Sequence, residues 1–282
     1  MSENIIIIPI YNDWKSLNKL LVQINQSINS SDIYKVLIIN DCSTQEIYIQ
    51  NQFLDKIKEI KILSLKNNLG SQKSISIGLD YLKKINDNFY ITIMDGDGED
   101  NPSEIKQMFE EAKINQNCIV TSHRKERNEN FITKTSYKLH LILSFFLTGH
   151  WISFGNFSCF NSNNLEKLNL NDVWYAYSSA VLKNSKIKKL YASRQKRYFE
   201  SSKVNILKLI EHSIRIASVF YSKVLFSSLI YLFIIYSFFG KFKIFFYFLI
   251  FALNFLILFI KIKNYSRDPI NYLLYTKDIK TI

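Results

Sequence analysis

Two kinds of hydrophobic pattern alternate along the first 122 residues. Between helical segments, short apolar runs rich in β-branched residues predict five buried strands: Ile5–Ile10, Val36–Asn40, Ile60–Leu65, Phe89–Met94 and Cys118–Thr121. Apolar residues that recur at three- and four-residue spacing predict amphipathic helices around Leu17, Leu79 and Met108. This alternation is typical of an α/β fold with a mostly parallel sheet and helices on both of its faces.

The C-terminal third shows a different pattern, two long stretches without a charged residue. Val224–Gly240 and Ile244–Ile260 consist mainly of Phe, Leu, Ile and Tyr, and each is seventeen residues long. This length is at the lower edge of what about 30 Å of hydrocarbon requires, and flanking lysines extend it by snorkelling. We predict two transmembrane helices within residues 219–263. The alternatives are buried helices of a soluble core and a hairpin that enters one leaflet only.

The segment before the first stretch has the pattern of an amphipathic helix. Apolar residues recur at helical spacing between residues 204 and 220, with Lys208, Glu211 and Arg215 on the opposite face. This pattern predicts a helix on the membrane surface over residues 201–218, with a helix of the soluble core as the alternative. Basic residues are more numerous at the outer ends of the helix pair than at its turn. The positive-inside rule therefore places both chain ends in the cytoplasm.

These patterns predict a multi-pass protein of the cell (inner) membrane with four parts. Residues 1–200 are expected to form the α/β domain, residues 201–218 the surface helix, residues 219–263 the two spans and residues 264–282 a cytoplasmic tail. The net charge of +12, from 36 Lys and Arg against 24 Asp and Glu, suggests an anionic partner such as nucleic acid, a membrane surface or a phosphorylated substrate.

Composition excludes several classes of protein. Seven Gly and three Pro beside 48% hydrophobic residues exclude collagen-like and disordered chains. The three cysteines, Cys42, Cys118 and Cys159, are isolated and show no Cys-x-x-Cys spacing. Neither a disulfide framework nor a structural zinc site is therefore indicated, and a reducing compartment fits best.

Acidic residues follow three of the predicted strands. In open parallel sheets ligands bind beyond the carboxyl ends of the strands, so these positions are candidates for chemistry. The three segments are Tyr11-Asn12-Asp13, Asp41-Cys42-Ser43-Thr44 and Asp95-Gly96-Asp97-Gly98-Glu99-Asp100. Carboxylates gathered at one sheet edge repel one another and attract a cation. Oxygen ligands select Mg²⁺ or Mn²⁺, which in turn hold a diphosphate.

Three other readings of these segments are not supported. An EF-hand needs Gly and Glu at its sixth and twelfth positions, where this chain has Asp100 and Lys106. No Gly-x-Gly-x-x-Gly follows the first strand, and the chain contains no Gly-x-x-x-x-Gly-Lys-Ser/Thr. Dinucleotide-binding and P-loop folds are therefore not indicated.

Taken together, the motifs resemble glycosyltransferase family 2, the inverting enzymes with the GT-A fold. The resemblance is to the membrane-anchored branch that includes dolichol-phosphate and polyprenyl-phosphate sugar transferases. It rests, in chain order, on Pro9-Ile10-Tyr11-Asn12-Asp13, Asn40-Asp41-Cys42-Ser43-Thr44, Asn67-Asn68-Leu69-Gly70, residues 94–104, Ser122-His123-Arg124-Lys125-Glu126-Arg127, Gly155-Asn156-Phe157-Ser158, and Arg197 with Ser202-Lys203-Val204-Asn205. The chain departs from the family at three positions, because Asn40, Glu99 and Glu200 stand where the family has Asp, Gln and Gly.

The resemblance implies roles for individual residues. The implied nucleotide-sugar site consists of Pro9, Tyr11, Asp13, Asp41, Lys73, Asp95 and Gly96. Asp97 is the implied ligand of Mg²⁺ or Mn²⁺ and, with Arg124 and Arg127, neutralises the leaving diphosphate. Arg197, Ser202 and Lys203 are the implied contacts of an acceptor lipid phosphate.

Three functions remain open from the sequence. The first is inverting transfer of a sugar from a nucleotide sugar to a membrane polyprenyl phosphate, in cell-surface polysaccharide or glycan assembly. This acceptor is already anionic and needs no general base. The second is transfer to a sugar hydroxyl of a lipid-linked saccharide, for which Asp172 and Asp100 are candidate bases. The third is a catalytically silent, membrane-anchored binding protein. The expected partners are the donor, the lipid-linked acceptor and the membrane, without nucleic acid, and a homo-oligomer stays open.

Overall fold

The protein was analysed as a computed structural model that describes residues 2–50, 54–85, 87–124, 131–193, 195–199, 206–238, 240, 243–263 and 270–282. The chain divides into two compact units. Unit 1 contains Met1–Glu126, Phe154–Ser202 and Asp268–Ile282, and unit 2 contains Arg127–Ser153 and Lys203–Arg267. Residues from the middle of the expected α/β domain therefore group with the C-terminal helices.

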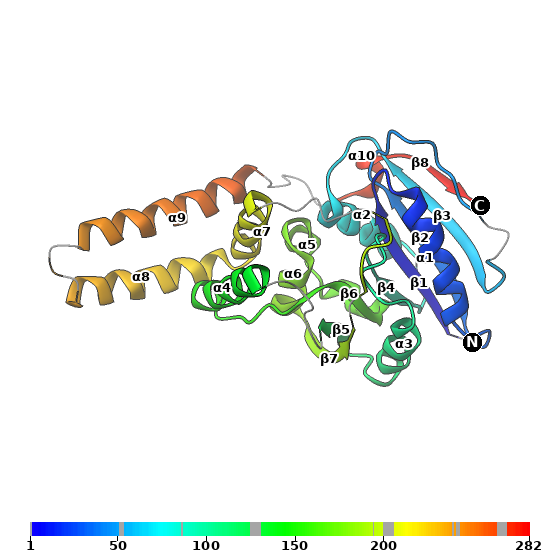
Figure 1. Cartoon of the computed structure of the whole chain (residues 1–282), viewed down its shortest axis with the longest axis horizontal. Coiled ribbons are helices and arrows are strands. Elements are labelled where there is room, and N and C mark those ends of the chain that lie inside the picture. Colours follow the sequence, from blue (N-terminus) through cyan, green and yellow to red (C-terminus); the bar gives the residue numbers. More distant parts are fainter. Residues whose placement is uncertain are drawn as a thin grey trace. The chain divides into compact units, whose positions relative to one another are not determined.

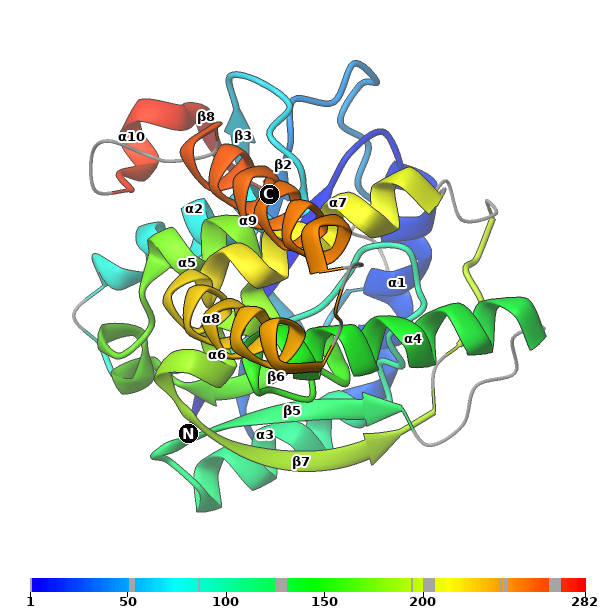
Figure 2. The same cartoon turned by 90° about the vertical axis from the view of Figure 1, so that its left-hand side faces the viewer.

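Unit 1 is built on a sheet that has eight strands in the described part of the chain, in the order β7-β5-β6-β4-β1-β2-β3-β8. The strands are β1 (Glu3–Ile10), β2 (Ile33–Asn40), β3 (Ile57–Leu65), β4 (Tyr90–Ile93), β5 (Cys118–Arg124), β6 (Phe154–Asn161), β7 (Lys186–Ala192) and β8 (Thr276–Thr281). The four strands β4, β1, β2 and β3 are parallel, whereas β6 runs antiparallel to β4 and β5. Figure 2 shows β5 and β7 side by side as a parallel pair. The expected mostly parallel α/β sheet is confirmed.

Helices cover both faces of this sheet because its central strand is apolar on both sides. Side chains alternate between the two faces along a strand. Ile6 and Ile8 of β1 pack in one cluster with α1 (Trp14–Ser27) and α3 (Glu104–Ile114). Ile5 and Ile7 pack in the other, with α2 (Ser71–Lys83), α5 (Leu170–Tyr175) and α6 (Tyr177–Asn184). Burial of each such side chain contributes about 1.5–3 kcal/mol. A short 3-10 helix, η2 (Ser162–Glu166), links β6 to α5.

The C-terminal residues belong to the sheet and do not form a separate tail. Strand β8 pairs antiparallel with β3, and Leu63 lies opposite Ile279. The short helix α10 (Tyr272–Tyr275) precedes β8, and the carbonyl of Tyr275 accepts a hydrogen bond from the Lys66 N–H at 2.9 Å. Figure 1 shows β8 beside β3. Of the expected tail over residues 264–282, the described residues 270–282 thus include a helix and a strand that pairs with the sheet, whereas residues 264–269 lie outside the described residues. The sequence concealed the strand because an exposed edge strand carries charged residues rather than an apolar run.

Unit 2 consists, in its described residues, of α4 (Phe131–Thr148), α7 (Ile206–Val219), α8 (Tyr221–Phe238) and α9 (Lys243–Lys263). Helices α8 and α9 run side by side (Figure 1). Val224 and Ile257 are fully buried between helices of this unit. The side chain of Asn254 donates to Ser228 at 2.8 Å, which joins α9 to α8. Hydrogen bonds of this kind connect helices in lipid.

Both α8 and α9 are long and apolar enough to cross a membrane. Their mean hydropathies are 1.5 and 2.4, and only 11% and 6% of the apolar windows are buried. Most of their large side chains are exposed, as Phe233 (72%) and Phe255 (71%) illustrate. Helices of a soluble core bury such residues, so the low burial indicates association of unit 2 with a membrane. The orientation of the chain ends stays a prediction.

Candidate functional site

The candidate site lies where β1, β2 and β4 end. These strands are parallel neighbours, so their carboxyl ends meet at one edge of the sheet. The three acidic segments noted in the sequence follow them directly, and the structure therefore brings Asp13, Asp41 and the segment from Asp95 to Asp100 to the same edge. Pro9 lies at the buried end of β1, whereas the side chain of Tyr11 is 47% exposed.

The loops after β1 and β2 are tied to each other through Asn12. Its side-chain oxygen accepts hydrogen bonds from the backbone N–H groups of Thr44, at 2.8 Å, and Gln45, at 3.2 Å. Its own N–H donates to the Ser43 hydroxyl at 3.0 Å. Asn12 and Cys42 both adopt positive φ, at 52° and 58°, which turns the two loops sharply. The adjacent Asp13 caps α1 by accepting from the Ser16 N–H at 3.3 Å.

Asp41 is held against the start of α2. Its two oxygens accept the backbone N–H groups of Leu69, at 2.7 Å, and Gly70, at 2.8 Å. Burial raises the pKa of Asp41, while these two hydrogen bonds and the charge of Lys73 act in the opposite direction. Lys73 itself lies with its Nζ 5.0 Å from the centre of the Trp174 ring. The Asp41 carboxylate and the Lys73 ammonium group therefore both lie near the first turn of α2.

The acidic segment after β4 forms a tight loop closed by its own carboxylates. One oxygen of Asp100 accepts the N–H of Asp95 at 2.9 Å, and one oxygen of Asp97 accepts the N–H of Glu99 at 3.0 Å. A side chain in place of Gly96 would bring a Cβ to 3.2 Å from the Pro9 carbonyl oxygen, so the loop approaches β1 closely.

Arg197 forms ion pairs with two carboxylates of this loop. Its Nη2 lies 2.6 Å from an Asp97 oxygen, and its Nε lies 3.5 Å from a Glu99 oxygen. Two backbone hydrogen bonds join the same two segments. The N–H group of Gln195 donates to the carbonyl of Glu99, and the N–H group of Tyr198 donates to the carbonyl of Asp97. The sequence predicts that Arg197 binds the acceptor, and this role stays a prediction; in the structure Arg197 lies beside Asp97, the expected metal ligand.

Aromatic residues after Arg197 anchor the same segment to α1. Lys19 lies 4.6 Å from the centre of the Tyr198 ring, and Lys15 lies 4.2 Å from that of Phe199. The Tyr198 hydroxyl donates to the Gln23 side chain. Burial, helped by the nearby Asp97 charge, raises the pKa of Tyr198 to about 12, so this hydroxyl keeps its proton at neutral pH.

A cleft of about 450 Å³, including space open to solvent, lies beside the acidic loop. One side is formed by Asp95, Glu99, Asp100 and Asn101, and the other by residues at the ends of β5, β6 and β7: Ser122, Gly155, Asn156, Phe157, Ala192 and Ser193. Asn156 donates its side-chain N–H to Asp95 at 2.9 Å. Asn156 is part of the Gly155-Asn156-Phe157-Ser158 motif, but the sequence assigned it no role. Gln72, which donates to Asn156 at 3.1 Å, was not predicted from the sequence.

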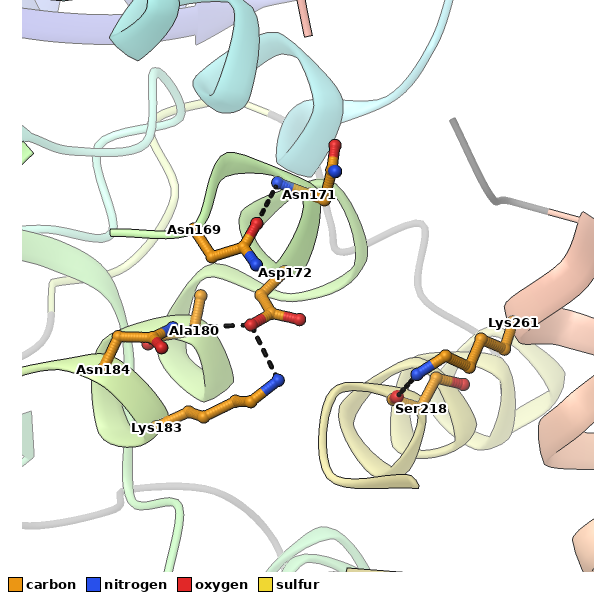
Figure 3. A network of polar contacts seen from close by, with 8 residues as sticks. All are labelled: Asn169, Asn171, Asp172, Ala180, Lys183, Asn184, Ser218 and Lys261. Atoms are coloured by element: carbon orange, nitrogen blue, oxygen red, sulfur yellow. Dashed lines mark hydrogen bonds and ion pairs between the residues drawn. The ribbon is translucent and has the colours of Figure 1, made fainter. Parts of the chain in front are cut away.

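The two candidate bases lie in different surroundings. Asp100 lines the cleft, whereas Asp172 accepts from Lys183, at 2.9 Å, and from Asn184, at 3.4 Å (Figure 3). Asp172 is buried in the first turn of α5 and so joins α5 to α6. The geometry therefore favours a structural role for Asp172. A separate contact in the same figure, from Lys261 to the Ser218 carbonyl at 3.2 Å, lies within unit 2.

Several predicted site residues lie outside the described residues. Arg127, Ser202 and Lys203 are among them, and Arg124 is described only as the last residue of β5. Its neighbour His123 is buried between Phe154 and Tyr191, and burial, with a smaller effect of Lys189, lowers its pKa to about 4. Within the part of the chain that is described, no three or more His, Cys, Asp or Glu side chains are grouped to hold a metal ion.

Comparison with known proteins agrees with this geometry. The profile of the family described as Glycosyl transferase family 2 matches residues 5–184. The uncharacterized glycosyltransferase YkcC of Bacillus subtilis is 26% identical over 144 aligned residues, and the match covers 49% of this chain and 43% of that protein. The uncharacterized glycosyltransferase sll0501 of Synechocystis is 25% identical over 138 residues, 48% of this chain and 42% of that protein. The chain thus matches less than half the length of these relatives.

Two solved structures share the fold at low sequence identity. Residues 1–349 of S. aureus TarS, in complex with UDP-GlcNAc, superpose with a TM-score of 0.50 at 18% identity, over 81% of this chain and 70% of that one. Glucosyl-3-phosphoglycerate synthase from Mycobacterium tuberculosis, in complex with Mn²⁺, UDP and glucosyl-3-phosphoglycerate, gives 0.51 at 12% identity, over 79% and 80% of the two chains.

Gly98 tests the packing of the acidic loop. It has a φ of 83°, and a Cβ on this residue would overlap the Tyr198 ring. We expect Gly98→Ala to lower the free energy of unfolding by about 1–3 kcal/mol, because it combines backbone strain with displacement of that ring. Thermal unfolding measures the effect. Gly155→Ala is the matched control, since a Cβ there meets open space. Equal melting temperatures for the two variants would contradict the packing described.

Proposed function

Because the chain belongs to glycosyl transferase family 2, we propose that it transfers a sugar, with inversion, from a nucleoside diphosphate to a membrane polyprenyl phosphate. The observation that carries the proposal is the convergence of Asp41, Asp95 and Asp97 at the carboxyl ends of the neighbouring parallel strands β2, β1 and β4, beside an open cleft. This edge is where doubly wound sheets bind nucleotides.

The donor occupies the part of the site whose loops are held by hydrogen bonds in the structure. Asn12 ties the β1 and β2 loops together, and Asp41 is fixed by two N–H donors. We assign the base and ribose to these loops and the diphosphate to the acidic segment with Asp95 and Asp97. The UDP-GlcNAc bound by TarS and the UDP bound by the mycobacterial synthase support a nucleotide sugar as donor.

Asp97 fits the role of metal ligand. Its carboxylate already lies against a cation, the Arg197 guanidinium, at 2.6 Å, so the position favours positive charge. Mg²⁺ is usually held by one or two carboxylates together with substrate phosphates, and Asp97 with a diphosphate forms such a set. The Mn²⁺ bound with UDP in the mycobacterial synthase supports a divalent cation as part of the donor site. A bound metal would supply charge neutralisation on the leaving diphosphate.

Arg197 provides positive charge at the same place. A guanidinium within reach of Asp97 and Glu99 also stabilises a diphosphate that enters the loop. We propose that Arg197 leaves Asp97 when the diphosphate arrives and pairs with a phosphate oxygen instead. Since the acceptor phosphate is itself anionic, the chain needs to position it and not to deprotonate it. Ser202 and Lys203 are proposed as contacts of the acceptor phosphate.

One observation favours a second function, transfer to a sugar hydroxyl. Such a reaction needs a carboxylate to take the proton, and two carboxylates, Glu99 and Asp100, line the cleft. The third function, a catalytically silent binding protein, is not favoured by the residues at which the chain departs from the family, because two of them have structural partners. Asn40 accepts the Ser43 N–H at 3.0 Å and so closes the turn after β2, and Glu99 pairs with Arg197.

Unit 2 is proposed to hold the enzyme on the cytoplasmic face of the cell membrane through α8 and α9. A third element supports this placement. The described side chains from Leu141 to Thr148 of α4 include no charged residue, and Leu143 (49%), Phe145 (46%) and Phe146 (57%) are exposed. The hydroxyl of Tyr231 on α8 donates to the Phe146 carbonyl at 2.5 Å, which holds α4 beside the first span. An apolar surface of this kind fits the acyl-chain boundary of a bilayer.

The transferase function is tested with membranes that contain the full chain, a panel of nucleotide sugars and a short polyprenyl phosphate. We expect a labelled lipid whose sugar is released by mild acid, because the new bond joins the anomeric carbon to a phosphate. Asp97→Asn should reduce its formation by about 100-fold or more. Asp87→Asn, on an exposed aspartate, is the matched control. Unchanged activity of Asp97→Asn would remove the proposed role of Asp97, and an acid-stable sugar–sugar linkage would favour the second function.

The membrane placement of the α4 region is tested by the fluorescence of Trp151, which follows α4 in unit 2 and whose ring centre lies 5.7 Å from that of Phe145 on α4. The Trp151 side chain is 52% exposed, whereas Trp14 and Trp174 are 4% and 5% exposed in the core of unit 1. In vesicles of brominated lipid we expect strong quenching of the wild-type protein and little quenching of Trp151→Phe, because bromine quenches tryptophans that touch acyl chains. Vesicles without bromine serve as control. Equal quenching of both proteins would contradict contact of Trp151 with lipid.

A further inference from the structure

Three hydrogen bonds join the core of unit 1 to Asp95. The backbone N–H of Tyr177 donates to Gln72 Oε1 at 2.6 Å. Gln72 Nε2 donates to Asn156 Oδ1 at 3.1 Å, and Asn156 Nδ2 donates to Asp95 Oδ1 at 2.9 Å. The four residues come from α6, α2, β6 and the loop after β4, so the chain of bonds links elements far apart in sequence.

The direction of this chain of bonds is set at one end. A backbone N–H can only donate, so Gln72 must turn its oxygen to Tyr177 and its NH₂ group to Asn156. Asn156 must then turn its oxygen to Gln72 and its NH₂ group to Asp95. The orientation of both amides therefore follows from the Tyr177 N–H alone, and the group at position 95 must accept.

The anchor at Tyr177 is rigid. Tyr177 is fully buried, and its hydroxyl lies 2.6 Å from the Ser158 hydroxyl. Ser158 donates its only hydroxyl proton to the Asn156 carbonyl at 3.0 Å, so the Tyr177 hydroxyl is the donor of that pair. Tyr177 is thus linked to Asn156 by two routes. Gln72 connects it to the side chain of Asn156, and Ser158 connects it to the backbone carbonyl of Asn156.

We propose that Gln72 is a positioning residue that, through Asn156, fixes the orientation in which the Asp95 carboxylate meets the nucleotide. Gln72 touches no substrate in this role. The proposal rests on the proposed function, since it takes Asp95 as a donor-site residue. It goes beyond that function because it assigns the geometry of Asp95 to a residue on α2 and a backbone N–H on α6.

The chain of bonds is tested without any ligand by thermal unfolding of the full chain in detergent. Gln72→Glu removes the NH₂ donor, so Asn156 must turn round and present its oxygen to the Asp95 carboxylate. We expect a melting temperature lower by about 3–6 °C. Adding Asp95→Asn supplies a donor at the far end and should restore more than half of the loss.

A second double variant, Gln72→Glu combined with Glu99→Gln, separates the effect of hydrogen bonding from that of simple charge repulsion. Glu99→Gln also removes a carboxylate from the loop but supplies no donor at position 95, so it should not rescue Gln72→Glu. Equal rescue by Glu99→Gln and Asp95→Asn would overturn the proposal, as would a Gln72→Glu protein as stable as the wild type. Gln107→Glu, on the exposed face of α3, controls for the added charge itself.

The positioning role is tested by calorimetry with UDP or GDP in the presence of Mn²⁺. We expect Gln72→Glu to bind at least about tenfold more weakly than the wild type and Gln107→Glu to bind equally well. Binding by Gln72→Glu as tight as that of the wild type would overturn the positioning role. A wild-type protein that binds neither nucleotide would instead contradict the proposed function, and the unfolding experiment would still decide whether the chain of bonds exists.

Discussion

Four carboxylates within six residues, from Asp95 to Asp100, are the constraint on which the rest of the site depends. At such short range like charges raise each other's energy unless each is compensated. In the structure each of the four carboxylates meets a donor or a cation. Asn156 donates to Asp95, Arg197 pairs with Asp97 and Glu99, and the N–H of Asp95 donates to Asp100. Every one of these partners except the last comes from a distant part of the chain.

The same constraint explains residues that have no chemical role of their own. Gly98 leaves room for Tyr198, which places Arg197 over the loop, and Tyr198 is in turn fixed by Gln23 and Lys19 of α1. On the other side, Gln72 and Tyr177 orient the amide that meets Asp95. A loop held by partners on both sides is preorganised, so its carboxylates need little rearrangement to hold the divalent cation that we propose for them.

The parts of the fold that could be predicted from the sequence are those with local periodicity. The runs that became β1 to β5 are visible because burial on both faces of the sheet leaves a continuous apolar pattern. The stretches that became α8 and α9 are visible because they contain long runs without a charged residue. Strand β8 was missed because its exposed edge residues carry charge, and β6 and β7 carry no continuous apolar run.

The candidate site likewise contains residues that could be predicted from the sequence and contacts that could not. Asp41, Asp95 and Asp97 were predicted because they directly follow strands, and parallel strand ends must meet. The ion pair of Arg197 with Asp97, the contacts of Gln72 and the pairing of Asp172 with Lys183 were not predictable. The contacts of Arg197 and Gln72 join residues 84 to 105 positions apart, and Asp172 and Lys183 lie on two short helices whose packing decides the partner. No local sequence pattern predicts such contacts.

The central claim is that the acidic loop after β4 receives the diphosphate of a nucleotide sugar together with a divalent cation. An experimental structure of the full chain with UDP or GDP and Mn²⁺, with anomalous scattering from manganese, tests it most directly. We predict a manganese peak at the Asp97 carboxylate, the diphosphate beside it, and the Arg197 guanidinium moved from Asp97 to a phosphate oxygen. A nucleotide bound elsewhere, with the pair of Arg197 and Asp97 unchanged, would contradict the account.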